Sequence, residues 1–270
     1  MLRGQVAIVT GASSGLGRAL ALELGTRGAQ LVLAARNEAG LAETARGLSP
    51  GGAAPLLVPG DLTDPDRCRG LIAQAIARFG RLDHLVLAAG LGMWTRFDEV
   101  TNPTMFERLM AVNYLAAVYC THAALPHLRE RRGLITVISS LQGRLAVPLH
   151  TGYAGAKHAL HGFFDSLRLE LDPGAPGILV VLPAWLGGTA LRSAALGPGG
   201  TPIGEAARAH RSAPLPAAQA ARQIVGAMER RQSELVLPAR MRVLLWLNRL
   251  APSLAAAIVR RRMRREDDAD

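Results

Sequence analysis

The chain has 270 residues, of which 49% are hydrophobic and 19% charged, and its formal net charge is +10. This composition excludes a disordered chain and fits one large globular α/β domain. Two cysteines exclude a disulfide framework, and because no ligand spacing accompanies the histidines, we expect no metal.

The positive charge is concentrated at the end of the chain. From residue 240 onward there are eight arginines against four acidic residues. The other arginines are scattered along predicted helices without interleaved aromatic residues, so we expect no nucleic-acid partner. The start, M-L-R-G-Q-V-A-I-V-T-G, passes directly into a strand pattern. We therefore expect no signal peptide and a cytoplasmic location.

Short apolar runs alternate with helical stretches along the chain. This alternation predicts a parallel sheet with helices on both faces, and right-handed crossovers make it a doubly wound, Rossmann-type α/β fold of about seven strands. We expect one domain over residues 1–240 and an amphipathic, Arg-rich extension at 241–270. The expected strands are residues 6–10, 31–35, 56–59, 82–89, 134–139, 178–182 and 235–237.

The first predicted turn, T-G-A-S-S-G-L-G over residues 10–17, places three glycines between a strand and a helix. Glycines permit a sharp turn and a close backbone approach, and the following helix N-terminus attracts a pyrophosphate. A purely structural glycine turn is the alternative. The pattern predicts a dinucleotide site formed by Gly11, Ser13, Ser14, Gly15, Leu16 and Gly17.

The residue after the second strand indicates which dinucleotide binds. NAD sites usually carry an acid there, whereas NADP sites carry an arginine. Here the strand ends L-A-A-R-N, so Arg36 predicts NADP(H) in preference to NAD(H), with an ordinary surface arginine as the alternative. After the third strand, Asp61 and Leu62 are expected at the adenine, unless Asp61 is simply a helix N-cap. Ala89 and Gly90 should lie near the nicotinamide.

The main catalytic pattern is Y-x-x-x-K at Tyr153 and Lys157, which share a helix face. Lys157 is the only lysine among the 31 basic residues. A neighbouring ammonium favours the phenolate, so we expect the Tyr153 pKa to fall below its usual value of about 10. Ser140, after a buried strand, is placed to hydrogen-bond a substrate oxygen. A solvated pair on a helix is the alternative.

Asn113 lies inside an otherwise apolar helical stretch, where an amide needs hydrogen-bond partners. We expect it to distort the helix and hold a water that relays protons to Lys157, or else to be a satisfied core amide. After residue 182, a segment rich in Gly, Ala and Pro at about 184–216 predicts a substrate lid. The expected substrate pocket consists of Met93, Trp94, Leu141, Gln142, Leu149 and Trp185.

Together these motifs resemble the short-chain dehydrogenase/reductase (SDR) family of single-domain type, over about residues 4–240. The stretch S-S-L-Q-G-R followed by Y-A-G-A-K is similar to the branch that contains 11β-hydroxysteroid dehydrogenase and related lipid carbonyl reductases. The resemblance implies that Tyr153 is the general acid or base and that Lys157 lowers its pKa and binds the nicotinamide ribose. It also implies that Ser140 orients the carbonyl and Asn113 completes the proton relay.

Two motifs depart from the family pattern. The N-N-A-G of the family is L-A-A-G here, ending at Gly90, which removes an amide that usually braces neighbouring strands. Its P-G-x-V-x-T begins at Pro183 but places Thr189 one position late, so the expected contact of Thr189 with the nicotinamide carboxamide depends on the local fold.

We therefore expect an NADP(H)-dependent oxidoreductase that interconverts a carbonyl and a secondary alcohol on an apolar, mid-sized substrate. The resemblance implies a homodimer or homotetramer. Two alternatives are a sugar-nucleotide epimerase or dehydratase, which also uses Y-x-x-x-K, and a catalytically silent NADP-binding, membrane-associated scaffold. The extension allows two interpretations: peripheral contact of residues 241–265 with an anionic membrane, or a helix pair that packs on the domain or a sister subunit.

Overall fold

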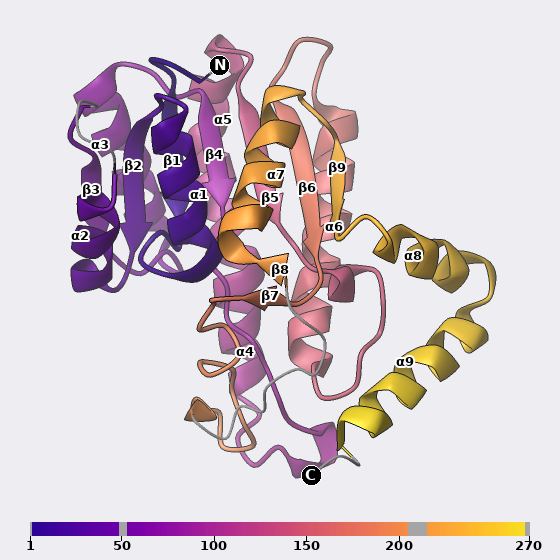
Figure 1. The fold of residues 1–270 in the computed structure, drawn as a ribbon. Helices are drawn as coiled ribbons and strands as arrows, with labels where there is room; N and C mark the ends of the chain where they lie inside the picture. Colours follow the sequence, from indigo (N-terminus) through magenta and orange to yellow (C-terminus); the bar gives the residue numbers. More distant parts are fainter. Residues whose placement is uncertain (1, 49–52, 205–214, 268–270) are drawn as a thin grey trace.

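The computed structural model describes residues 2–48, 53–204 and 215–267, with side chains described as far as Arg262. Its main sheet has seven parallel strands in the order β3-β2-β1-β4-β5-β6-β9 (Figure 1). This order confirms the predicted doubly wound sheet. The strands are β1 (Val6–Thr10), β2 (Gln30–Ala35), β3 (Leu56–Pro59), β4 (His84–Leu87), β5 (Leu134–Ile138), β6 (Gly177–Pro183) and β9 (Glu234–Leu237).

Helices cover both faces of this sheet (Figure 1). On one face lie α1 (Gly15–Thr26), α2 (Glu38–Arg46) and α7 (Ala217–Glu229), and on the other lie α3 (Pro65–Phe79), α5 (Ala116–Glu130) and α6 (Thr151–Glu170). Short helices precede α5 and α6: η1 (Phe97–Glu99), α4 (Met105–Met110), a π-helical turn (Ala111–Leu115) and η3 (Leu141–Gly143).

The period-two alternation of each strand explains why two separate cores form. In β1, Val6 and Ile8 pack with α3, α5 and α6, whereas Ala7 and Val9 pack with α1 and α7. Both faces are therefore dry, as expected for parallel strands that read as continuous apolar runs.

The chain runs outward from β1 to β3 and then returns to β4 beside β1. A crevice forms outside the carboxyl ends of the strands where the direction of winding reverses. β4 is shorter than the predicted run of residues 82–89, because the backbone N–H groups of Ala88 and Ala89 donate to the Thr10 hydroxyl (3.0 and 3.2 Å). These two N–H groups therefore bond to a side chain instead of a neighbouring strand, and the chain turns into the crevice.

The lid segment leaves β6 and crosses below the sheet. Its strand β7 (Leu186–Gly187) pairs with β8 (Leu215–Pro216), and Leu196 forms a bridge to Met93. Residues 205–214 of the predicted lid lie outside the described residues. The pairing thus joins the two ends of this segment to each other, and the bridge ties its middle to the chain after β4.

Two helices follow β9: α8 (Met241–Leu250) and α9 (Pro252–Asp267). They form an arm beside the lid (Figure 1). Ala255 and Val259 of α9 are buried in an apolar cluster with Leu145, and Leu244 of α8 packs on the same cluster. The extension is therefore docked on the domain by one face.

Within the described part of the chain, one continuous helical segment, Met105–Glu130, passes the length and apolarity test for a membrane-crossing helix. Several of its residues, Cys120, Ala124 and Leu128 among them, belong to the core on the α3–α5–α6 face of the sheet. A core helix of a globular domain has the same properties.

Candidate active site

A cavity of about 1150 Å³ lies in the crevice at the carboxyl ends of the strands. Its lining comes from the turn after β1, the ends of β2 to β6, the first turns of α6, the lid and the extension. Ordinary small-molecule pockets measure roughly 300–1,000 Å³. The volume therefore suits a cofactor with a substrate beside it.

The turn between β1 and α1 is shaped for close approach of a ligand backbone. Gly11 has φ +67°, and a Cβ there would lie 2.8 Å from the Ala89 Cα; a Cβ on Gly17 would run into the Gly11 carbonyl oxygen. Ser14 precedes α1 but its side chain makes no capping hydrogen bond. The first N–H groups of α1 are thus without a side-chain acceptor at the cavity, which fits a pyrophosphate.

Arg36 lines the cavity after β2 and is exposed. Arg18, by contrast, makes a two-pronged ion pair with Glu43 (2.7 and 2.9 Å). Among the ion pairs of the described residues, none includes Arg36. The Arg36 charge helps to lower the pKa of Asp61 in the same cavity, but its guanidinium forms no ion pair with a carboxylate of the described residues.

Asp61 and Leu62 both line the cavity after β3. The Asp61 carboxylate accepts hydrogen bonds from the Thr63 N–H and hydroxyl (3.0 and 2.9 Å), and the backbone bond is the main reason that its pKa lies below the usual value. The helix that follows is capped by Asp64, which accepts from the Asp66 N–H at 2.8 Å. Asp61 is thus not the N-cap of α3.

Ser140, Tyr153 and Lys157 are brought together at the cavity wall, and all three are buried. Ser140 follows β5; its hydroxyl accepts from the Gln142 N–H at 3.2 Å and acts on the Tyr153 phenol, whose pKa it lowers in part. The Lys157 Nζ donates to the Ile138 carbonyl at 2.9 Å and lies 5.6 Å from the centre of the Tyr153 ring. The solvated-pair alternative is therefore wrong.

The expected lowering of the Tyr153 pKa is also wrong. Burial removes water from the phenolate and raises the pKa of Tyr153 to about 12, although the Ser140 hydrogen bond lowers it in part. Burial equally lowers the pKa of Lys157 to about 8. At neutral pH the phenol is therefore protonated and the amine remains largely an ammonium.

Asn113 occupies the π-helical turn, so the predicted distortion of the helix is confirmed. Its amide donates to the carbonyls of Leu91 (2.8 Å) and Leu109 (3.0 Å), and its oxygen accepts from the Leu91 N–H (3.1 Å). A π-helical turn commonly marks a functional position. Here it directs an amide from the middle of a helix onto the backbone that follows β4.

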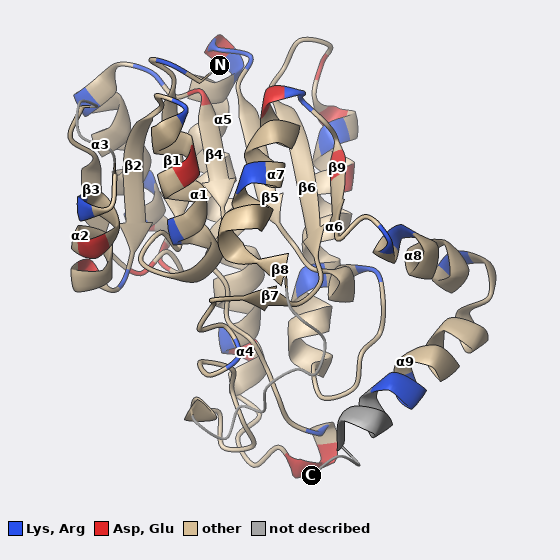
Figure 2. Cartoon of the chain, in the orientation of Figure 1, with Lys and Arg blue, Asp and Glu red and all other residues tan. Residues whose placement is uncertain are grey.

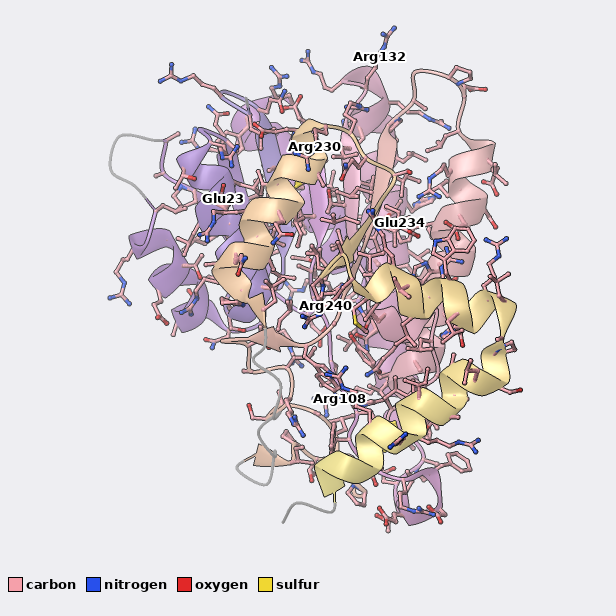
Figure 3. All side chains as sticks on the ribbon, turned by 45° about the vertical axis from the view of Figure 1, so that its right-hand side comes forward. Glu23, Arg108, Arg132, Arg230, Glu234 and Arg240 are labelled. Atoms are coloured by element: carbon pink, nitrogen blue, oxygen red, sulfur yellow. The ribbon has the colours of Figure 1, made fainter. Side chains whose placement is uncertain are left out.

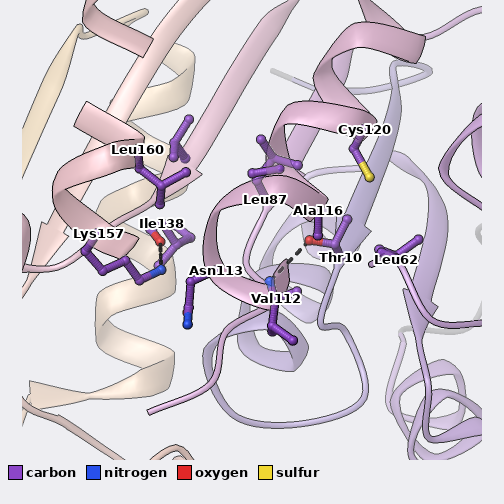
Figure 4. Close-up of a pocket in the computed structure, with 13 residues that line it drawn as sticks. Thr10, Leu62, Leu87, Val112, Asn113, Ala116, Cys120, Ile138, Lys157 and Leu160 are labelled. Atoms are coloured by element: carbon purple, nitrogen blue, oxygen red, sulfur yellow. Dashed lines mark hydrogen bonds between the residues drawn. The ribbon is translucent and has the colours of Figure 1, made fainter. Parts of the chain in front are cut away.

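Asn113 does not line the large cavity but a separate inner one of about 10 Å³, together with Lys157 (Figure 4). This volume is close to that of one water probe, and polar atoms of Asn113, Lys157 and Thr10 face it. A Cβ on Gly90 would lie 3.3 Å from the Asn113 Oδ1 and 3.9 Å from the Lys157 Nζ. Gly90 thus keeps a side chain out of the space between them.

The predicted cofactor residues after β4, at the end of β6 and in the lid also reach the cavity. Pro183, Thr189, Ala89 and Gly90 line it, and a Cβ on Gly15 would lie 3.3 Å from the Thr189 Cβ. Thr189 therefore lies over the glycine turn despite its shifted position in the sequence.

At the substrate end, the cavity is lined by five of the six predicted residues: Met93, Trp94, Leu141, Gln142 and Trp185. Leu149 does not line it. The side chain of Leu149 is half-buried and packs instead on the cluster of Leu145, Ala255 and Val259 beneath the extension. That part of the prediction is wrong because the extension supplies a competing apolar surface.

Several lining residues were not predicted. The His150 ring packs 5.0 Å from Trp94, and the Arg192 guanidinium lies 4.2 Å over the same indole. The extension contributes Met241, Leu244, Val259 and Arg262. Arg192 is one of thirty arginines, and no local pattern distinguishes it from the others.

The segment that carries Arg192 is held over the cavity by backbone hydrogen bonds. Leu196 donates to the Gly92 carbonyl and accepts from the Trp94 N–H, both at 2.9 Å. Searched over the described residues, the structure contains no group of three or more His, Cys, Asp or Glu side chains placed to hold a metal ion.

Comparison with known proteins agrees with this geometry. The short chain dehydrogenase family matches residues 5–195. An 11-beta-hydroxysteroid dehydrogenase A from Sesamum indicum is 41% identical over 184 residues, covering 68% of this chain and 53% of the relative. An 11-beta-hydroxysteroid dehydrogenase 1A from Arabidopsis thaliana is 40% identical over 188 residues, with the same shares. The chain spans about half the length of these curated relatives.

Solved structures show the same fold. A short-chain dehydrogenase from Streptomyces avermitilis superposes with a TM-score of 0.79 at 27% identity, covering 97% of this chain and 98% of its own. A Burkholderia phymatum short chain dehydrogenase/reductase in complex with NAD gives a TM-score of 0.82 at 24% identity, with 94% and 95% covered.

The glycine turn, the switch-point crevice and the buried Ser140, Tyr153 and Lys157 define the class of nicotinamide-dinucleotide oxidoreductases with a Rossmann fold. Within that class the chain belongs to the short-chain dehydrogenase/reductase family. This family binds a nicotinamide cofactor, which the cradle at the turn after β1 fits.

Gly17→Ala should weaken binding of the reduced nicotinamide cofactor about tenfold or more, because the added methyl group must displace the Gly11 carbonyl and so deform the cradle. Fluorescence titration of NADPH measures the change. Gly70→Ala is the control, since nothing lies within 4 Å of its added methyl group. Equal affinities of the two variants would contradict the role of the turn.

Proposed function

We propose that this protein is an NADP(H)-dependent oxidoreductase that interconverts a carbonyl and a secondary alcohol on an apolar, mid-sized substrate. The observation that carries the proposal is the convergence of Ser140, Tyr153 and Lys157 on one wall of a cavity that begins at the glycine turn. The curated relatives named as 11-beta-hydroxysteroid dehydrogenases support the reaction class.

The hydroxyls of Ser140 and Tyr153, which both line the cavity, form the polar end of the substrate site. In reduction, a carbonyl oxygen placed between them accepts from both, which polarises the carbonyl and fixes its orientation. A bound nicotinamide supplies the hydride. The Tyr153 phenol then donates its proton to the oxygen as negative charge develops there, and its raised pKa ensures that the proton is present at neutral pH.

Lys157 stabilises the phenolate left on Tyr153 after proton transfer, because the hydrogen bond to the Ile138 carbonyl holds its ammonium 5.6 Å from the centre of the Tyr153 ring. It is also the residue that would hold the nicotinamide ribose. The inner cavity between Asn113 and Lys157 has room for one water, through which a proton can return to the site.

Two further features support the finer parts of the proposal. The absence of an ion pair to Arg36 within the described chain leaves its guanidinium for a 2′-phosphate, which favours NADP(H) over NAD(H). The rings of Trp94 and Trp185, 6.4 Å apart, and Leu141 give the substrate end an apolar wall. Such a wall selects for hydrocarbon rather than sugar substrates.

We further propose a cytoplasmic homodimer or homotetramer that associates through α5 and α6. These helices carry the half-buried Tyr119 and Phe163, the half-buried Tyr114 lies in the π-helical turn before α5, and the exposed Leu169 lies at the end of α6. Apolar residues on neighbouring helix faces are typical of subunit contacts.

Tyr153→Phe should lower kcat by about 10²–10⁴-fold, because the carbonyl oxygen loses its proton donor. The assay is a panel of ketones, aldehydes and alcohols followed by the absorbance of reduced nicotinamide. NADPH binding should persist, and Tyr119→Phe should retain activity. Retained turnover in Tyr153→Phe would refute the assignment, and cofactor binding by the wild-type protein without any turnover across the panel would favour a silent scaffold.

Arg36→Ala should weaken NADPH binding by about 10–100-fold, with little change for NADH, because only NADPH loses a charge-assisted phosphate contact. Titration with both nicotinamides measures the preference. Arg46→Ala removes an exposed arginine from the end of α2 and serves as the matched control. An unchanged ratio in Arg36→Ala would show that Arg36 does not read the 2′-phosphate.

A further inference from the structure

The extension carries most of the large apolar side chains that the described structure exposes. Five of them, between 43% and 78% exposed, lie on α8 and α9, whereas the other three are scattered over the domain. Side chains in contiguous exposed patches mark interaction surfaces, and scattered ones do not. We call the following set the outer stripe: Val243, Trp246, Leu250, Leu254 and Ile258.

Helix geometry separates the outer stripe from the residues that contact the domain. Val243, Trp246 and Leu250 are spaced i, i+3, i+7, and Leu254 and Ile258 are spaced i, i+4, so each set shares one helix face. Other faces pack inward: in α9, Ala255 and Val259, each one residue after a member of the stripe and so about 100° round the helix from it, are buried. Both helices are therefore apolar on two sides, and the domain covers only one.

The charges around the outer stripe have a single sign. Residues 240–262 contain six arginines and no acidic residue, and Figure 2 shows only basic colour on the described parts of α8 and α9. The ion pairs formed within the described chain include none of these arginines. Arg240 (labelled in Figure 3) and Arg262 line the active-site cavity, so the arginines that border the stripe are Arg242, Arg249, Arg260 and Arg261.

The inward face of the extension also forms a wall of the active-site cavity. Met241 and Leu244 of α8, with Val259 and Arg262 of α9, line it opposite the lid. An apolar ligand that leaves the cavity between the lid and the extension therefore emerges beside the outer stripe.

We propose that the extension docks the protein on the surface of an anionic lipid bilayer. The outer stripe inserts at the boundary between headgroups and acyl chains, with Trp246 at the interface and the arginines on anionic headgroups. α8 has only 10 residues and is followed by Pro252, whereas a span needs about 20, so the helices lie in the plane of the membrane.

A second copy of the chain is a poorer occupant of this surface. A two-fold contact places the same patch on both subunits, so arginines would face arginines without an acid between residues 240 and 262 to separate them. An anionic bilayer supplies both the apolar layer and the opposite charge. It follows, resting on the proposed function, that the apolar substrate enters the cavity from the membrane.

Vesicle flotation tests the docking with the full chain. The protein should float with phosphatidylcholine vesicles that contain phosphatidylserine and bind pure phosphatidylcholine far more weakly. The triple variant Val243→Ser/Trp246→Ser/Leu250→Ser should bind anionic vesicles at least about tenfold more weakly. Arg242→Gln/Arg249→Gln should bind about 30-fold more weakly, since each arginine near the surface contributes roughly one factor of five.

Matched control variants remove exposed apolar side chains or arginines from the domain instead of the extension. Phe97→Ser deletes an exposed apolar side chain of the domain, and Arg129→Gln/Arg131→Gln deletes two exposed arginines. Both should float like the wild type. Wild-type protein that ignores anionic vesicles, or extension variants that bind them as the wild type does, would overturn the proposal. The proposal would also be overturned if the wild type did not bind vesicles and formed a dimer that the triple variant dissociates.

Delivery of the substrate is measured separately from docking. The triple variant should reduce a water-soluble ketone at the wild-type rate, because its three side chains do not line the cavity, but should lose turnover of a ketone presented in anionic vesicles. Equal loss on both ketones would overturn membrane delivery. Failure of the wild type on the water-soluble ketone would instead count against the proposed function.

Discussion

The arrangement of the site depends on one buried hydrogen bond, from the Lys157 ammonium to the Ile138 carbonyl at the end of β5. An ammonium removed from water is costly unless strong acceptors surround it, and this one has its acceptor on the central sheet. The bond holds the first turns of α6 against the strand that carries Ser140. Tyr153, one helical turn before Lys157, is thereby directed at Ser140 and into the cavity. A bond of this kind also explains why the chain keeps a lysine here, since a planar guanidinium does not present one compact donor to a strand end.

The burial of Tyr153 and Lys157 determines their protonation states. Because both groups are buried, the pKa values of Tyr153 and Lys157 move apart, to about 12 and about 8, which is the direction that disfavours charge on either. The pair therefore rests as a neutral phenol beside an ammonium, which is the form that gives a proton to a developing alkoxide. The extension and the lid contribute to this dryness, since Met241 and Val259 from one and Trp185 from the other close the substrate end. Binding of the extension to a membrane would complete the same wall from outside.

The parts of the site that depend on neighbouring residues could be predicted from the sequence. The glycine turn, Arg36 after β2, and the i, i+4 relation of Tyr153 and Lys157 are local, and local geometry follows from residue type and spacing. The failures depend on contacts between distant segments. Leu149 packs against the extension, which lies more than a hundred residues further along the chain. Arg192, in the lid, stacks on Trp94 of the domain. The Tyr153 pKa is set by burial and not by the neighbouring Lys157 on its helix. Asn113 was predicted in part. A polar amide inside an apolar helical stretch predicted a distorted helix, but not that the amide would bind the Leu91 backbone.

The single lysine allows the central claim to be measured directly. Protein labelled with ¹³C at lysine Cε carries one labelled side chain, so an NMR titration reports the protonation of Lys157 alone. A dry ammonium held by the Ile138 carbonyl beside a neutral phenol should titrate at about 8. A midpoint near the usual value of about 10.4 would mean that water reaches Lys157, and the buried proton-transfer site described above would then be wrong.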